Sequence, residues 1–351
     1  MNYSSTNYSI SAFALLGFLT FALVGLITPQ IRKIAIHFNA VDAPNLDRKT
    51  QKEPVPYLGG IAIAIGVLFA SYGSMLAVDF SWNTIRLAST VLIPAVAISA
   101  MGLWDDLRGL QPWPRLIAQT FTAVAVSTIL IATNTSGVAF GNAFLNYGIT
   151  TLWIVGVCNS INFFDNHDGG AAGTVAVITF FLFFIAYDRQ QILVSALAVV
   201  TAGATAGFLL WNRHPAKIYM GDAGSLFLGI IISVLTIRLS PGVIPVYKSL
   251  AIPVLLMAVP ILDTTVAVIS RLYRGISPFQ GGRDHLSHRL MRLGLNRKIT
   301  AISLWALAAF YAALALALYL WPDTYGTQII FIATIAWLLK LIGFLRIPSE
   351  G

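Results

Sequence analysis

Eleven long apolar runs constrain this chain more than any other feature. Of its 351 residues, 57% are hydrophobic and only 10% are charged, and the mean hydropathy is +0.78. About 20 apolar residues are enough to cross a bilayer as a helix, and in hydrocarbon a helix satisfies its own backbone hydrogen bonds. The sequence therefore predicts an all-α, polytopic membrane bundle that forms one domain over residues 1–351. The expected spans are 10–27, 58–78, 85–104, 115–132, 148–164, 171–187, 191–211, 224–240, 246–270, 299–320 and 327–345.

The basic residues predict which loops face the cytoplasm. Eleven spans place the termini on opposite sides, and 18 of the 22 Lys and Arg residues belong to one side. The positive-inside rule makes that side cytoplasmic and puts the N terminus outside. It also accounts for the net charge of +8 without a nucleic-acid partner, and the single cysteine excludes an intramolecular disulfide. The predicted cytoplasmic loops are 28–57, 105–114, 165–170, 212–223 and 271–298.

Acidic residues and histidines gather on this same side, which indicates that any chemistry takes place there. The densest polar cluster runs from Asn159 to Gly173, directly after an apolar run. Asp165 and Asp168 are spaced i, i+3 and would share a face on a helical turn. Helix capping explains one or two such polar residues but not six. We therefore expect this cluster to help hold a magnesium ion and a diphosphate.

Two further carboxylate clusters lie at predicted span ends. Asp105 and Asp106 repel each other, which favours a cation between them, although a solvated acid pair beside Arg108 and Arg115 is the alternative. Asp222 follows a glycine and precedes an apolar helix. Backbone N–H groups at such a helix start attract anions, and a carboxylate is a hard oxygen ligand that suits magnesium. A short amphipathic turn is the plainer interpretation of the second cluster.

The remaining candidates are an acid inside a span and a basic loop. Asp263 falls within a predicted span, where an acid faces a partner or a wet cavity. The loop 271–298 contains seven basic residues, together with His285 and His288 at i, i+3 spacing. Arginines there could bind phosphate, although the positive-inside rule or anionic lipid explains them too. Lys52 is a further candidate for binding a phosphate.

Together these motifs resemble the polyprenyl-phosphate N-acetylhexosamine-1-phosphate transferase family of glycosyltransferase family 4. The resemblance extends in order from about residue 41 to residue 295, and only the ordered set makes it specific. The Pro54–Gly60 motif favours the N-acetylhexosamine branch over the muramoyl-pentapeptide branch. The motifs are Val41-Asp-Ala-Pro-Asn45, Pro54-Val-Pro-Tyr-Leu-Gly-Gly60, Asp105-Asp106, Asn162-Phe-Phe-Asp165-Asn-His-Asp168-Gly169, His214-Pro-Ala-Lys217-Ile-Tyr-Met-Gly-Asp222-Ala-Gly-Ser225 and His285-Leu-Ser-His288-Arg289.

The resemblance implies a multi-pass enzyme of a bacterial cytoplasmic membrane that moves a sugar 1-phosphate, most simply GlcNAc-1-phosphate, from a UDP-sugar to undecaprenyl or another polyprenyl phosphate. UMP is released and a lipid-linked cell-envelope glycan is started. Magnesium is the implied cofactor, with manganese as an alternative, and a homodimer is left open. The implied catalytic residues are Asp105, Asp106, Asp165 and Asp168; the metal ligands are Asp222 and, less directly, Asp105; the substrate-binding residues are Lys52, Asn162, Asn166, Lys217, Arg283, His285, His288 and Arg289.

Two departures from the family pattern and several alternatives stay open. Ser287 stands where the family loop often has a histidine, and Gly170 where a larger apolar residue is usual. Whether Asp106 acts as a base or forms a transient adduct is not fixed by the sequence, and we favour direct attack by the lipid phosphate. A UDP-MurNAc-pentapeptide transferase, a transporter and a membrane scaffold are the other functions considered.

Overall fold

The structure is a computed structural model that describes residues 8–42, 54–78, 81–137 and 141–349. Within these ranges the chain forms helices almost throughout, and one pair of short antiparallel strands aligns Val41 with Pro56. The elements are α1 (Ile10–His37), β1 (Val41–Asp42), β2 (Val55–Pro56), α2 (Gly59–Val78), α3 (Trp82–Arg108), α4 (Pro112–Ala132), α5 (Ala143–Phe164), α6 (Gly170–Asp188), α7 (Ile192–Asn212), α8 (Gly221–Arg238), α9 (Val246–Leu256), α10 (Ala258–Tyr273), α11 (Leu286–Arg292), α12 (Arg297–Leu320) and α13 (Gly326–Arg346).

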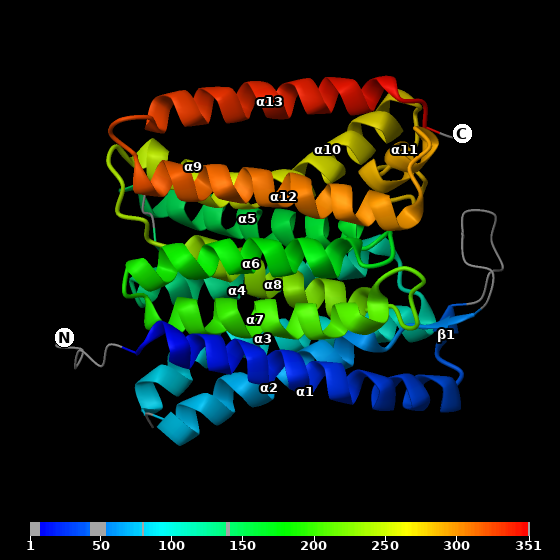
Figure 1. The fold of residues 1–351 in the computed structure, drawn as a ribbon, viewed down its shortest axis with the longest axis horizontal. Coiled ribbons are helices and arrows are strands. Elements are labelled where there is room, and N and C mark those ends of the chain that lie inside the picture. Colours follow the sequence, from blue (N-terminus) through cyan, green and yellow to red (C-terminus); the bar gives the residue numbers. More distant parts are fainter. Residues whose placement is uncertain (1–7, 43–53, 79–80, 138–140, 350–351) are drawn as a thin grey trace.

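The predicted all-α membrane bundle is confirmed. Within the described ranges, ten helices are long and apolar enough to cross a membrane, and the pair α9 and α10 makes an eleventh span if it is counted as one. The long helices lie side by side, and the chain passes back and forth between the two ends of the bundle (Figure 1). The predicted continuous span 246–270 is wrong in one respect, because α9 and α10 are bent by 71° at Met257.

Two predicted loop boundaries need correction. α1 continues to His37 and α3 continues to Arg108, so Asp105 and Asp106 lie on the last turn of a helix and not in a loop. Hydropathy marks where a chain leaves hydrocarbon, whereas a helix ends where its backbone conformation changes. In α3 that change comes at Gly109, whose φ is 67°.

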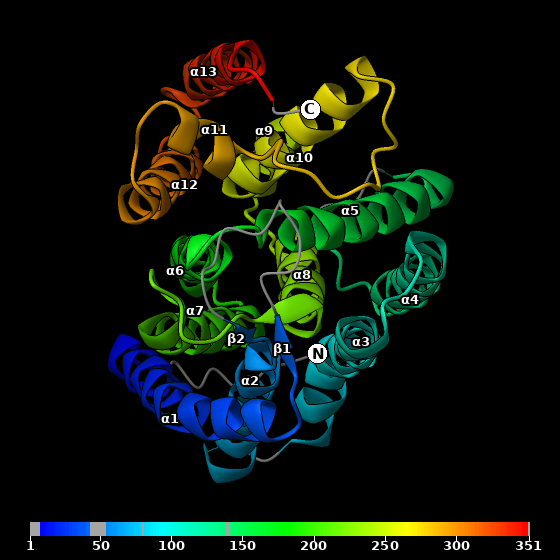
Figure 2. The ribbon, with the colours of Figure 1, turned by 90° about the vertical axis from the view of Figure 1, so that its right-hand side faces the viewer.

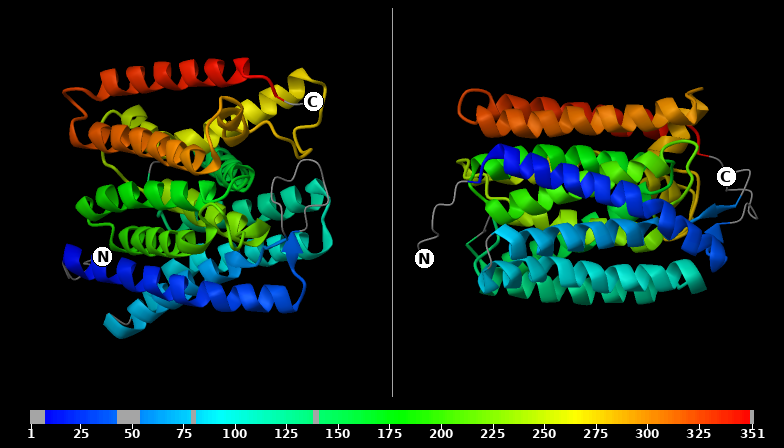
Figure 3. Two further views of the ribbon diagram at one scale, coloured as in Figure 1. Left: turned by 45° about the vertical axis from the view of Figure 1, so that its right-hand side comes forward. Right: turned by 60° about the horizontal axis from the view of Figure 1, so that its bottom comes forward.

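The two ends of the bundle differ in what they contain. The described N-terminal end of α1 lies at one end, whereas the β1–β2 pair, α11 and the C-terminal end of α13 lie at the other (Figures 1 and 3). The predicted cytoplasmic loops that the structure describes all join helices at this second end. Its assignment to the cytoplasm stays a prediction from the positive-inside rule.

Helix α8 is the central element. It is the most buried of the candidate spans and lies near the middle of the bundle when viewed from its end, with α2, α3 and α5 packed against it (Figure 2). Helix α2 packs closely against the first residues of α8, because Gly60 and Gly224 let the two backbones come into contact. The N–H groups of Gly59 and Gly60 donate to the carbonyls of Tyr219 and Met220, both at 2.9 Å. These bonds fix the start of α8 at the end of the bundle that holds the polar residues.

Candidate active site

A carboxylate centre forms where three helices meet the start of α8. One oxygen of Asp222 lies 2.6 Å from Nη1 of Arg115 on α4, and the same nitrogen is bonded to the Asp105 carboxylate on α3. The other oxygen of Asp222 accepts a hydrogen bond of 2.8 Å from Nδ2 of Asn162 on α5. The predicted residues Asp105, Asn162 and Asp222 are therefore brought together, around an arginine that the sequence had placed only beside the acid pair.

Asp106 has a different task from its neighbour Asp105. Its two oxygens accept from the backbone N–H groups of Asp222, at 2.9 Å, and Ala223, at 3.1 Å. It thus caps the N-terminus of α8, where a negative charge is also favoured by the helix dipole. Gly221, with φ of 69°, leaves room for this approach, because a Cβ there would lie 2.5 Å from Asp106 Oδ2. A catalytic role for Asp106 stays a prediction.

The donor set fits a magnesium ion that is completed by substrate. Among the described residues, no three His, Cys, Asp or Glu side chains are grouped so that they could hold a metal by themselves. Mg²⁺, however, is usually bound through one or two carboxylates plus substrate phosphates and waters, not in an all-protein cage. Asp222 and Asp105 provide two carboxylates that converge on one cationic group, Arg115, which matches this requirement.

Asp165 and Asp168 do not form the paired face that the sequence predicted. Residues 165–169 make a turn between α5 and α6 and not a helix, so the i, i+3 spacing does not align their side chains. Asp168 Oδ2 instead bonds to His214 Nδ1 at 2.7 Å and to the N–H of Ala216 at 3.2 Å. For Asp165, burial and then the charges of Asp222, Asp106 and Asp168 raise the pKa well above its usual value. Asp168 therefore holds the loop that contains His214 and Ala216. Asp165 is the acid of this turn whose pKa responds to the charges of the carboxylate centre.

The other predicted residues of this side are distributed around the centre. Asn166 donates to the carbonyl of Phe163 at 2.7 Å and accepts from the Ser287 hydroxyl at 2.5 Å. Lys217 is exposed, with its ammonium 5.3 Å from the centroid of the Trp211 ring. Lys52 lies outside the described residues.

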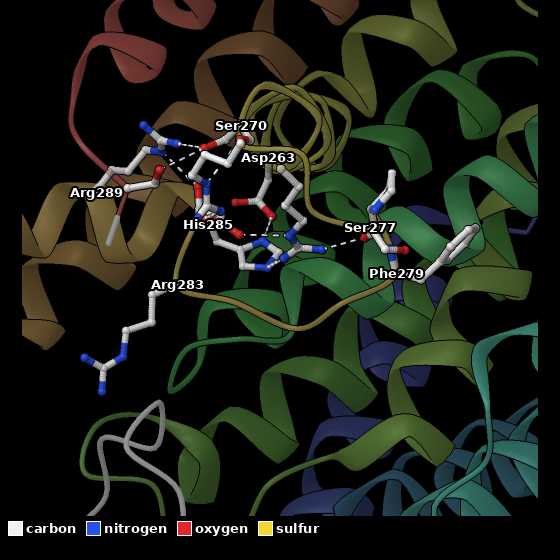
Figure 4. Close-up of polar contacts among 12 residues, drawn as sticks. Asp263, Ser270, Ser277, Phe279, Arg283, His285 and Arg289 are labelled. Atoms are coloured by element: carbon white, nitrogen blue, oxygen red, sulfur yellow. Dashed lines mark hydrogen bonds and ion pairs between the residues drawn. The ribbon is translucent and has the colours of Figure 1, made fainter. Parts of the chain in front are cut away.

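The loop before α11 is held by residues of α10. His285 is only 5% exposed, and its Nδ1 lies 2.7 Å from Oδ2 of Asp263, which is fully buried in α10. Arg289 is 1% exposed and bonds to carbonyl groups of the protein, whereas the side chain of Arg283 points away from this cluster (Figure 4). His288 is partly buried, and burial lowers its pKa to about 4. Of these residues, Arg283 and His288 are the better placed to meet a substrate.

Comparisons with known proteins identify the family of this chain. Residues 88–240 match the model of glycosyl transferase family 4. The chain is 32% identical to the probable undecaprenyl-phosphate N-acetylglucosaminyl 1-phosphate transferase of Bacillus subtilis, over 84% of this chain and 81% of that protein. It is also 32% identical to the decaprenyl-phosphate N-acetylglucosaminephosphotransferase of Mycolicibacterium smegmatis, over 86% and 81%. The chain belongs to glycosyl transferase family 4.

The predicted resemblance to this family is thereby confirmed. A phospho-N-acetylmuramoyl-pentapeptide-transferase of Mycobacterium bovis is 27% identical over 76% of this chain, which is less than for the N-acetylglucosamine relatives. The stretch that matches the family 4 model runs from within α3 to just beyond α8. It therefore contains the whole carboxylate centre, whereas α11 and its loop lie beyond it.

Two residues in or near the candidate site gained their importance only from the structure. Arg115 reads in the sequence as one of many basic residues on one side of the membrane, and its position just inside a span, after two prolines, is the signal that could have marked it. The sequence marked Asp263 as a costly intramembrane acid that faces a partner or a wet cavity, without identifying which. The structure supplies that partner, His285, from a loop 22 residues away.

Proposed function

We propose that this protein transfers an N-acetylhexosamine 1-phosphate, and specifically GlcNAc-1-phosphate, from a UDP-sugar to a polyprenyl phosphate and releases UMP. The names of its two relatives at 32% identity support the sugar and the lipid acceptor. The observation that carries the proposal is the convergence of Asp105 and Asp222 on Arg115 at the polar end of a membrane bundle, with Asn162 donating to Asp222. A lipid phosphate in the bilayer and a soluble nucleotide sugar could meet at such an end.

The reaction needs charge neutralisation and alignment more than covalent help from the protein. Asp222 and Asp105 are the residues that would hold Mg²⁺, which when bound would neutralise charge on the diphosphate. Asn162 orients the Asp222 carboxylate, and Asp106 fixes the helix start on which Asp222 sits. A phosphate oxygen of the polyprenyl phosphate attacks the sugar-linked phosphorus, and the bond to UMP breaks. We place this site at the cytoplasmic face of a bacterial cytoplasmic membrane.

The test uses membranes that contain the full chain, with Mg²⁺, a polyprenyl phosphate and a panel of nucleotide sugars. UDP-GlcNAc is expected to give UMP release that depends on the lipid, with weaker or no release from UDP-GalNAc and UDP-MurNAc-pentapeptide. A clear preference for the pentapeptide substrate would move the protein to the muramoyl branch. Uptake of substrate into vesicles without UMP release would instead show a transporter.

Asp222→Ala provides the sharpest test of the metal role. The variant is expected to insert normally and to lose transfer, because it removes both the contact with Arg115 and the acceptor for Asn162. Membrane fractionation checks insertion and UMP release checks activity. Wild-type activity of this variant at saturating Mg²⁺ would rule out Asp222 as a metal ligand.

A further inference from the structure

A buried acid reaches out of its membrane helix to hold the loop before α11. Asp263 is 0% exposed, and both of its oxygens are used. Oδ2 lies 2.7 Å from Nδ1 of His285, and Oδ1 accepts a 2.7 Å hydrogen bond from the N–H of Leu286. An acid inside a span is costly unless it is fully bonded, so this pair of contacts explains why the carboxylate can lie there.

The opposite side of the His285 ring faces an arginine. Nε2 of His285 is 3.1 Å from Nη2 of Arg271, which is itself only 3% exposed. A guanidinium has donors and no acceptor, so Nε2 must accept this hydrogen bond and carry no proton. Nδ1 must then carry the proton that Asp263 accepts. The two neighbours together select one neutral tautomer of His285.

A buried ion pair holds Arg271 in this position. Asp284 is 1% exposed and pairs with Arg271 at 2.8 Å and with Arg274 at 2.5 Å. A proton on Nε2 would point at the N–H of Arg271, and two donors cannot bond to each other.

His285 also sets the distance between this loop and the carboxylate centre. The ring of Phe163 packs edge-on against His285, with centroids 6.2 Å apart, and Arg271 lies over the same phenylalanine at 5.5 Å. Phe163 follows directly after Asn162, the residue that donates to Asp222. A shift of the His285 ring would therefore displace Phe163 at the end of α5.

We propose that Asp263 and Arg271 hold His285 as the neutral Nδ1–H tautomer, and that His285 is a positioning residue that fixes the start of α11 beside the turn after α5. With both ring nitrogens bonded inside the protein, it offers nothing to a phosphate (Figure 4). The side chain of His288 makes no hydrogen bond within the described part of the chain, so His288 is the loop histidine that remains able to contact the substrate. The inference deepens the proposed function, on which its kinetic test rests.

The kinetic test compares an amide with alanine at position 285. His285→Asn can still donate to Asp263, so its kcat is expected to stay within about tenfold of wild type, whereas His285→Ala should lose on the order of 100-fold, the upper range for outer-shell positioning groups. His288→Asn is the matched control and is expected to raise KM for the UDP-sugar. Equal loss of activity in folded His285→Asn and His285→Ala would overturn the proposal, because it would mean that the imidazole itself contacts the reacting groups.

A spectroscopic test needs no substrate and so separates this inference from the proposed function. Full-length protein labelled with ¹⁵N-histidine is expected to show, at neutral pH, one neutral ring protonated at Nδ1 that disappears in His285→Asn. Asp263→Asn should shift that signal, and this variant also shows whether the loop depends on the carboxylate. A doubly protonated His285, or an Nε2–H tautomer, would refute the inference. Failure of the wild type to release UMP would refute the proposed function alone.

Discussion

Replacing Arg289 by methionine is expected to free the loop helix α11 from the C-terminal end of α13. Arg289 is 1% exposed and is the largest fully buried side chain in the described chain. Its guanidinium donates to the carbonyl of Asp284 at 2.8 Å, to the carbonyls of Phe344, at 2.6 Å, and Ile347, and to the hydroxyl of Ser270 at 2.9 Å. One side chain therefore joins α11 to α10 and to the segment after α13.

The magnitude follows from these four acceptors. A hydrogen bond to a charged group contributes about 1.5–3 kcal/mol net, so the simple sum is about 6–12 kcal/mol. That sum is an upper bound, because the carbonyls of Phe344 and Ile347 near the chain end can bond to water once the segment opens. Loss of one partner of a buried charged network usually costs about 3–5 kcal/mol, and we expect that range for Arg289→Met. Arg289→Lys keeps the charge but not the forked geometry, so its stability should lie between that of the wild type and that of Arg289→Met.

Hydrogen exchange in detergent, without substrate, is the appropriate measurement because the effect is local. At one tenfold per 1.4 kcal/mol, a change of 3–5 kcal/mol raises the opening equilibrium of residues 286–292 and 344–349 by about 10²- to 4 × 10³-fold. Lys340→Met, on the exposed side of α13, is the control and should leave exchange unchanged. Unchanged exchange in Arg289→Met together with a raised KM for the UDP-sugar would refute this reasoning and support the phosphate contact that the sequence predicted.

Two further outcomes are expected. Gly60→Ala should destabilise the fold, because its Cβ would overlap the backbone of Gly224. Gly73→Ala on the same helix meets open space and should leave stability unchanged. Thermal unfolding of both variants tests this, and equal melting temperatures would contradict the close contact. Because burial lowers the pKa of His288 to about 4, the unfolded chain takes up a proton between about pH 6.5 and 4 that the folded protein does not. Stability should therefore fall as the pH drops through that window and fall less in His288→Asn, and parallel pH curves for the two proteins would show that His288 is not responsible.

The sequence predicted the membrane bundle well because hydropathy alone determines which segments can lie in hydrocarbon. It did not predict the bend between α9 and α10, because the run is apolar throughout and the signal of Pro253 and Pro260, on either side of Met257, was not used. The clustering of polar residues at one end was also predictable, from span ends and the count of basic residues.

The tasks of individual acids were not predictable in the same way. Asp105 and Asp106 are adjacent in sequence and point in different directions on the last turn of α3, so one meets Arg115 and the other meets the start of α8. Which neighbour each one meets depends on how α3 packs between α4 and α8. The pairing of Asp263 with His285 likewise depends on how a loop folds back onto α10.

The end of α5 explains why the sequence concentrates so many polar residues there. Within five residues, Asn162 donates to Asp222 of the carboxylate centre, Phe163 packs against His285, and Asn166 accepts from Ser287 of α11. These contacts arise from one helix end and the turn that follows it. The carboxylate centre and the α11 loop therefore cannot shift independently of each other. Ser287 takes part in this connection through its hydroxyl, which donates to Asn166.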